Sequence, residues 1–186
     1  YHKLTFSMAY FYNELYILPF SHDENVHGKA TVIQKMWGDY EDKFRQARAF
    51  YMYIFTHPGK KLNFMGGEFA QFREWDESRE QDWDLLKYPL HDSFHKYMIK
   101  LGELYTSLPS LYDGDYNMAS FRWLIVDGVR QCVYAYERIC KDETTVCCFN
   151  FSDKPQKISL GFDTSCSLNE LLNSDWDIYS GKSRTP

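Results

Sequence analysis

The sequence lacks any apolar run close to the roughly 20 residues that a membrane-spanning helix needs, so it gives no sign of a bilayer span. It also lacks an excess of positive charge, because 21 Lys and Arg stand against 26 Asp and Glu, for a net charge of -5. A nucleic-acid partner would require a basic face, so this balance argues against one. Repeats and low-complexity segments are missing too, and the 44% of hydrophobic residues predicts a folded core.

Metal-binding cysteine motifs are absent as well. The number of cysteines is odd, two are adjacent, and none forms a CxxC pair: Cys132, Cys140, Cys147, Cys148 and Cys166. This pattern argues against a zinc site and predicts reduced, mostly buried thiols in a cytoplasmic protein. The chain has no initiator Met and no signal-peptide layout at its start, so we expect an internal piece of a longer protein.

The first part of the chain alternates short apolar runs with helical patterns. We predict strands at 15–18 and 61–65. A helix is predicted over 41–56 with Asp39 as its N-cap, and a second helix opens at Asp92 or Ser93, with an apolar stripe that continues to Leu111. Strand, loop and helix in this order are typical of parallel βα units.

The pattern changes after residues 112–118. Four strands are predicted there, with turn signals between them, at 121–126, 129–139, 144–151 and 156–160. We therefore expect an α/β region over 1–114 and a small antiparallel all-β domain over 115–186.

The loop PFSHDENVHGK after the first strand holds two histidines and two acidic residues. His22 and His27 are five positions apart, which does not match the i, i+4 spacing of a helical zinc motif, so we predict no metal. Asp23 lies where catalytic residues occur if the strand belongs to a parallel barrel, at its C-terminal end. On spacing alone, Asp23 and Glu24 could equally cap the next helix or face water.

Further motifs follow this loop in order: KMWGD, HPGKKLNFMGGEFAQFREW and DWDLL. Together with LPFSHDENVHGK they closely resemble the glycogen branching enzymes of the α-amylase superfamily, strongly over about residues 4–112 and more loosely beyond. The resemblance implies the last βα units of a TIM (β/α)8 barrel, followed by a small antiparallel β-sandwich domain. It also implies cleavage of an α-1,4-glucan and transfer of the segment to a 6-hydroxyl, by retaining double displacement.

The SHD motif corresponds, in that resemblance, to a transition-state stabiliser at Asp23 and a sugar-binding imidazole at His22. Glu68, in MGGEFAQ, would have a structural or substrate-contact role, and Glu24 would brace the loop. Trp37 and Trp75 are candidate sugar-stacking platforms, because the C–H faces of glucose pack on indole rings; core packing is the alternative. For Arg73, Glu74 and Asp76, around Trp75, we expect a solvated charged loop.

The family's nucleophilic Asp and acid/base Glu lie upstream of SHD, so we expect this chain to be inactive alone. An α-glucan hydrolase of the same superfamily, or a non-catalytic glucan-binding module, remains an alternative, although HGK, KMWGD and EW…DWDLL favour branching. The predicted partner is α-1,4-glucan or glycogen, without a cofactor. The incomplete barrel predicts that the isolated chain either self-associates or rearranges its N-terminal part.

Overall fold

The computed structural model describes residues 3–161 and 167–186, so the predicted thiol of Cys166 lies outside the described residues. The chain divides into two compact units. Unit 1 consists of the chain up to Ile17, Thr56–Lys60 and Tyr105–Leu171, and unit 2 of Leu18–Phe55, Lys61–Leu104 and Leu172–Pro186. None of the described helices is long and apolar enough to cross a membrane.

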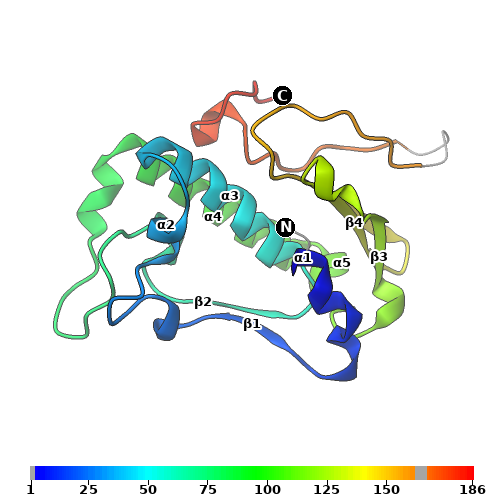
Figure 1. Ribbon diagram of the computed structural model, residues 1–186, viewed down its shortest axis with the longest axis horizontal. Coiled ribbons are helices and arrows are strands. Elements are labelled where there is room, and N and C mark those ends of the chain that lie inside the picture. The colour runs from blue at the N-terminus through cyan, green and yellow to red at the C-terminus, as the bar shows by residue number, and fades with distance from the viewer. Residues whose placement is uncertain (1–2, 162–166) are drawn as a thin grey trace. The chain divides into compact units, whose positions relative to one another are not determined.

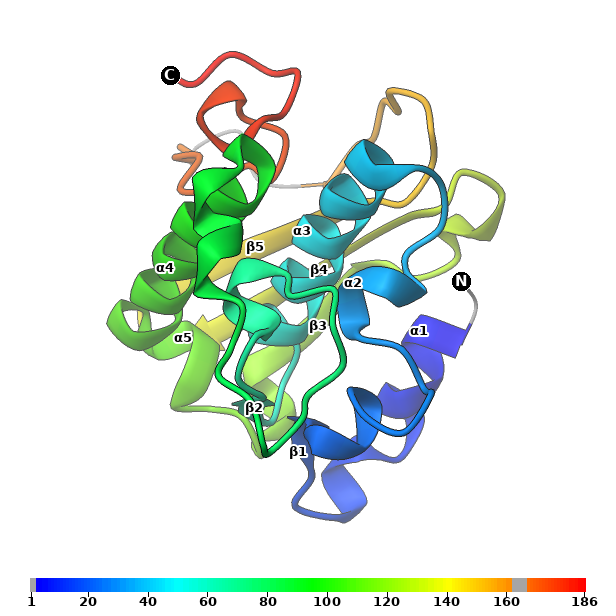
Figure 2. The same ribbon diagram turned by 90° about the vertical axis from the view of Figure 1, so that its left-hand side faces the viewer.

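Most of the regular elements are labelled in Figure 1, and β5 is labelled in Figure 2. The α-helices are α1 (Lys3–Phe6), α2 (Val32–Lys35), α3 (Tyr40–Thr56), α4 (Pro89–Ser107) and α5 (Pro109–Tyr112). The strands are β1 (Ile17–Phe20), β2 (Lys60–Asn63), β3 (Phe121–Ile125), β4 (Val133–Cys140) and β5 (Glu143–Asn150). Short 3-10 helices occur at Ser7–Ala9, Phe11–Asn13, His22–Glu24, Gly67–Phe69, Trp83–Lys87, Met118–Ser120, Gly128–Arg130 and Asp177–Tyr179.

The two long helices confirm the predicted patterns, with shifted ends. The Asp39 carboxylate accepts the Asp42 N–H at 3.0 Å and so caps α3. Helix α4 begins earlier than predicted, at Pro89, because proline at the first helical position loses no hydrogen bond there. It ends at Ser107 rather than continuing along the apolar stripe, since Pro109 disfavours a helical conformation at the residue before it.

Unit 1 contains a three-stranded antiparallel sheet of order β3-β4-β5, seen in Figure 2. Tyr134 and Tyr136 on the central strand β4 are fully buried and pack in the interior of this unit. Beside them the buried guanidinium of Arg138 donates to Asp115 Oδ1 and to the Thr56 carbonyl, both at 2.7 Å.

Two predictions for this half of the chain are wrong. Residues 156–160 are irregular rather than a strand; Ile158 is 38% exposed there, so the segment has no buried face to pair against a sheet. The cysteines are also less buried than predicted, because only Cys147 of the four described thiols is buried and Cys148 is exposed.

The core of unit 2 lies between α3 and α4 and is rich in aromatic rings. Phe94 on α4 is fully buried and packs edge-on against Phe44 and Tyr51 of α3. The last segment of the chain joins this core: Tyr179 packs against Tyr97 with ring centroids 5.2 Å apart. Burying rings in this way stabilises the folded chain by about 25 cal/mol for each Å² of apolar surface that is removed from water.

We expect Phe94→Ala to lower the free energy of unfolding by about 3–5 kcal/mol, because it leaves a cavity among rings that cannot collapse fully. Ile99→Ala, on the same helix, is the matched control, since Ile99 is 50% exposed; its cost should stay near about 1 kcal/mol or below. Urea unfolding followed by circular dichroism measures both. Equal costs would contradict the placement of the core.

His91 is a buried histidine at the edge of this core, and its pKa is shifted. It is 1% exposed, its ring packs edge-on against Phe44 at 4.9 Å, and its Nδ1 lies 2.8 Å from the Phe69 carbonyl. A carbonyl oxygen only accepts, so Nδ1 carries the proton. Burial disfavours the charged ring and lowers the pKa of His91.

This lowered pKa predicts that acid destabilises unit 2. Below about pH 6.5 the unfolded chain binds a proton that folded His91 resists, so the free energy of unfolding falls as pH drops. His91→Asn keeps a donor for the Phe69 carbonyl but does not titrate. Urea midpoints at about pH 7.5 and 5.5 should therefore differ less in this variant than in the wild type, whereas equal differences would rule out His91 as the source.

Candidate functional site

The turn that follows β1 is a capping box. Ser21 N–H donates to Glu24 Oε2 at 2.7 Å, and Asp23 N–H donates to Ser21 Oγ at 3.2 Å. This pairing matches the S-x-x-E signature in the sequence and forms the 3-10 turn His22–Glu24. Glu24 therefore braces the loop, as predicted, and its carboxylate is held against the backbone.

His22 and Asp23 are the exposed members of this turn. Their side chains are 55% and 65% exposed, with His22 Nε2 3.6 Å from Asp23 Oδ1. Lys29 Nζ lies 3.9 Å from the same oxygen. Ion pairs this exposed contribute little to stability, so the Asp23 carboxylate remains available to an outside partner.

Aromatic rings from two other segments stand beside His22. Its ring centroid lies 6.4 Å from that of Trp75 and 6.2 Å from that of Phe64. Trp75 and Phe64 themselves meet at 5.4 Å, nearly perpendicular. The fold of unit 2 thus brings together three of the predicted site residues, His22, Asp23 and Trp75.

Trp37 and Glu68 are placed differently. Trp37 is 81% exposed, and its backbone is held by Gln46, whose side-chain amide accepts Trp37 N–H at 3.2 Å and donates to the Trp37 carbonyl. Glu68 lies in the 3-10 helix Gly67–Phe69. The pKa of Tyr51 is raised mainly by burial and, to a smaller extent, by the negative charge of Glu68. Among the contacts described for the chain, none joins Trp37 or Glu68 to His22 or Asp23.

The loop after the turn is tied to a distant segment by Glu74. Its carboxylate accepts the Gly28 N–H at 2.9 Å and the Ala30 N–H at 2.7 Å, and these two bonds lower the pKa of Glu74. The next residue continues the link, because Trp75 N–H donates to the Asn25 carbonyl at 2.9 Å.

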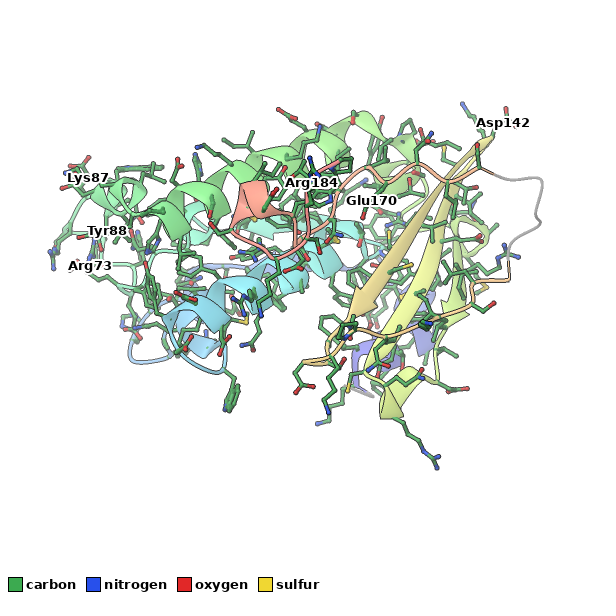
Figure 3. The ribbon with its side chains drawn as sticks, turned by 90° about the horizontal axis from the view of Figure 1, so that it is seen from above. Arg73, Lys87, Tyr88, Asp142, Glu170 and Arg184 are labelled. Carbon is green, nitrogen blue, oxygen red and sulfur yellow. The ribbon has the colours of Figure 1, made fainter. Side chains whose placement is uncertain are left out.

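Arg73 closes the segment that carries Glu74 and Trp75. Its guanidinium donates to both oxygens of Asp82, at 2.9–3.1 Å, and to the Glu80 carbonyl at 2.7 Å. The prediction of a solvated charged loop is therefore wrong for Arg73 and Glu74, whereas the Asp76 carboxylate accepts hydrogen bonds from Ser78, two positions along the same loop. Arg73 is labelled in Figure 3.

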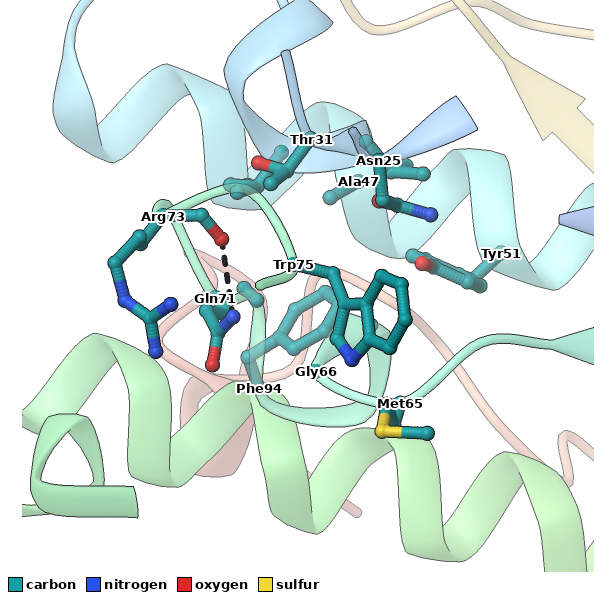
Figure 4. A pocket seen from close by; sticks show the side chains of 14 residues that line it. Asn25, Thr31, Ala47, Tyr51, Met65, Gly66, Gln71, Arg73, Trp75 and Phe94 are labelled. Carbon is teal, nitrogen blue, oxygen red and sulfur yellow. Dashed lines mark hydrogen bonds between the residues drawn. The ribbon is translucent and has the colours of Figure 1, made fainter. Parts of the chain in front are cut away.

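A hollow lies behind this turn, lined by Asn25, Tyr51, Met65, Gln71 and Trp75 among others, with Gln71 donating to the Arg73 carbonyl (Figure 4). Its free volume is about 10 Å³, the room of a single water molecule. A sugar ring does not fit in that space.

Comparison with known proteins decides the family. No protein-family model matches the chain. The 1,4-alpha-glucan branching enzyme GlgB of Bacillus cytotoxicus is 42% identical over 185 residues, which cover 98% of this chain and 29% of that protein. GlgB of Pseudomonas fluorescens is 44% identical over 181 residues, or 96% of this chain and 24% of that protein. This chain belongs to the 1,4-alpha-glucan branching enzyme family.

The predicted resemblance is thereby confirmed at the level of the family. GlgB of Oceanobacillus iheyensis agrees, at 42% identity over 183 residues. The chain spans less than a third of the length of these branching enzymes, and the match assigns no role to any single residue. The roles of His22, Asp23, Trp37, Glu68 and Trp75 stay predictions.

Sequence reasoning missed Arg73 and Glu74 for a simple reason. The partners of Glu74 are 44 and 46 positions away along the chain, so no local pattern announces the contact. The one available signal was the FREW run itself, in which two charged residues directly precede a tryptophan inside a motif typical of the branching enzymes.

We expect Arg73→Lys to loosen the segment that carries Trp75, because an ammonium group cannot make the paired contacts of a guanidinium. Hydrogen exchange of the Trp75 amide, which is bonded to Asn25, should become about tenfold faster, equivalent to about 1.4 kcal/mol. Arg79→Lys, at an exposed position of the same loop, is the control and should leave that rate unchanged. An unchanged rate in Arg73→Lys would show that Asp82 does not hold the segment.

Proposed function

We propose that this chain takes part in 1,4-alpha-glucan branching, the activity stated in the names of its relatives. In that reaction an α-1,4-glucan is cleaved and the freed segment moves to a 6-hydroxyl, which creates an α-1,6 branch in glycogen. The observation that carries the proposal is the turn after β1, where the exposed Asp23 carboxylate stands next to the His22 imidazole and the Trp75 indole.

The three carboxylates at this turn differ in what they can still do. Glu24 and Glu74 accept backbone N–H bonds, so neither is free to attack a sugar or to donate a proton. Among the ion pairs described for the chain, those of Asp23 are with the exposed His22 and Lys29. Asp23 is therefore the carboxylate of this turn that a substrate can reach.

In the proposed mechanism Asp23 stabilises the transition state. A retaining transfer needs one carboxylate that attacks the anomeric carbon and another that protonates the leaving oxygen; we assign neither step to a residue of this chain. As the ring flattens, its hydroxyls shift, and Asp23 accepts hydrogen bonds from them in the shifted position. His22 donates to a sugar oxygen at the point of cleavage.

Trp75, Trp37 and Glu68 are proposed to contact the rest of the glucan. The Trp75 indole adjoins His22 and can stack against the next glucose. Trp37 offers an exposed indole on a backbone fixed by Gln46, suited to a sugar unit farther along the chain. Glu68 would accept sugar hydroxyls.

The finer architecture follows from the same resemblance. We infer that β1, β2, α3 and α4 belong to a (β/α)8 barrel and that β3, β4 and β5 belong to a C-terminal β domain. Because strand β2 would then lack the neighbouring units of a full barrel, and its Leu62 is 45% exposed, we keep the expectation that the isolated chain either self-associates or rearranges its N-terminal part. A cytoplasmic location, without a cofactor, remains part of this proposal.

The proposal is tested in a chimera in which this chain replaces the matching 185 residues of GlgB from Bacillus cytotoxicus. We expect the chimera to produce α-1,6 linkages from amylose, measured as growth of their anomeric proton NMR signal. Asp23→Asn should lower the rate by about 10²-fold or more, the usual cost of losing one transition-state hydrogen-bonding group, and His22→Asn should lower it in the same direction.

Asp76→Asn is the control for this experiment, because it removes a carboxylate whose contacts are with Ser78 and should leave the rate unchanged. The chain alone should leave amylose unaltered, and α-1,6 growth with it would overturn its predicted inactivity. New reducing ends without branches would favour the hydrolase, and binding without turnover in an otherwise intact chimera would favour a glucan-binding module.

A further inference from the structure

The loop that follows the His22–Asp23 turn has an unfavourable backbone. His27, Gly28 and Ala30 all have positive φ, at 57°, 76° and 65°, and only glycine adopts this region without steric cost. A Cβ on Gly28 would meet no atom within 4 Å, so glycine is required there for its backbone angle rather than for space. Some contact outside the loop must hold this shape.

Glu74 supplies that contact. Its two carboxylate oxygens divide between two backbone donors, Oε2 accepting from Gly28 and Oε1 accepting from Ala30. Backbone N–H groups gathered in a turn form a concave site that is known to bind anions. Hydrogen bonds to an ionised acceptor are also roughly twice as strong as neutral ones.

The backbone segment that carries Glu74 is itself fixed by its neighbours. Arg73 is locked to Asp82 on one side, and Trp75 N–H is bonded to the Asn25 carbonyl on the other. Glu74 therefore links two segments whose backbones are already held by other contacts.

The link continues to the exposed site residues. Asn25 Nδ2 donates to the Ser21 carbonyl at 2.8 Å, at the start of the turn that carries His22 and Asp23. Lys29, between the two amides that Glu74 binds, is the residue whose ammonium group lies near Asp23. The Trp75 ring, one residue after Glu74, adjoins the His22 ring.

We infer that Glu74 is a positioning residue for glucan contact: by binding the Gly28 and Ala30 amides it fixes the His22–Asp23 turn against the Trp75 indole. It touches no substrate itself. The inference rests on the proposed function, because it takes His22, Asp23 and Trp75 to be the groups that meet the glucan.

The test compares three variants of the full 186-residue chain by NMR. Glu74→Gln keeps the shape of the side chain but turns an N–H donor toward a backbone donor. Its His22 imidazole and Trp75 indole signals should shift, together with the Gly28 and Ala30 amides. Glu74→Asp keeps the charge on a shorter stem that reaches one amide, so its ring shifts should be smaller. Asp76→Asn, the matched loss of charge in the same loop, should leave both rings in place.

The second measurement is a titration with maltoheptaose, followed on the His22 and Trp75 signals. We expect Glu74→Gln to raise Kd about tenfold, Glu74→Asp to raise it less, and Asp76→Asn to leave it unchanged. Wild-type ring signals and wild-type Kd in Glu74→Gln would overturn the inference, as would equal effects of Glu74→Gln and Asp76→Asn.

The two failures can be told apart. If wild-type His22 and Trp75 do not respond to maltoheptaose, the proposed glucan contact at this turn fails, whereas the ring shifts in the variants still decide whether Glu74 holds the turn. If Glu74→Gln loses its fold by circular dichroism, the comparison of Glu74→Asp with Asp76→Asn decides the matter in the same way.

Discussion

The loops of unit 2 that carry His22, Trp37 and Trp75 depend on one constraint. Their backbone N–H and C=O groups need hydrogen-bond partners although most of these residues lie outside helices and strands. Such groups must find partners when they leave helix and strand ladders, and here side chains provide them. Glu24 and Glu74 accept N–H groups of the SHD loop, whereas Gln46 binds both polar groups of the Trp37 backbone. Lys35 likewise donates to the Glu24 carbonyl. These loops are therefore fixed mainly by side-chain contacts to their backbone, with little regular helix or strand of their own.

This constraint separates what the sequence could predict from what it could not. Helices α3 and α4 have periodic apolar faces, and the S-x-x-E capping box uses partners three positions apart, so both were readable from local patterns. The Glu74 clamp joins positions more than 40 residues apart. Its charge and exposure made it look like any solvated loop residue, and only the folded chain reveals the two amides it binds.

The errors in the second half of the chain have a related origin. Alternating residues at 156–160 resemble a strand, but a strand needs a partner edge and a buried face, and Ile158 remains 38% exposed. The closing residues 172–186 gave no helical or strand pattern at all. They nevertheless pack Trp176 and Tyr179 into the core of α3 and α4, with Arg48 Nε bound to the Ser174 carbonyl at 2.5 Å.

A division of labour among carboxylates follows from these contacts. An acidic residue that accepts two backbone N–H groups is stabilised as the anion and held in one orientation, which suits it to a fixed structural role. An acidic residue without such bonds keeps its lone pairs for a ligand, at the cost of a less defined position. Glu74 and Asp23 represent these two cases within one loop system. The loose carboxylate gains a defined location because the bound one fixes the backbone that carries it.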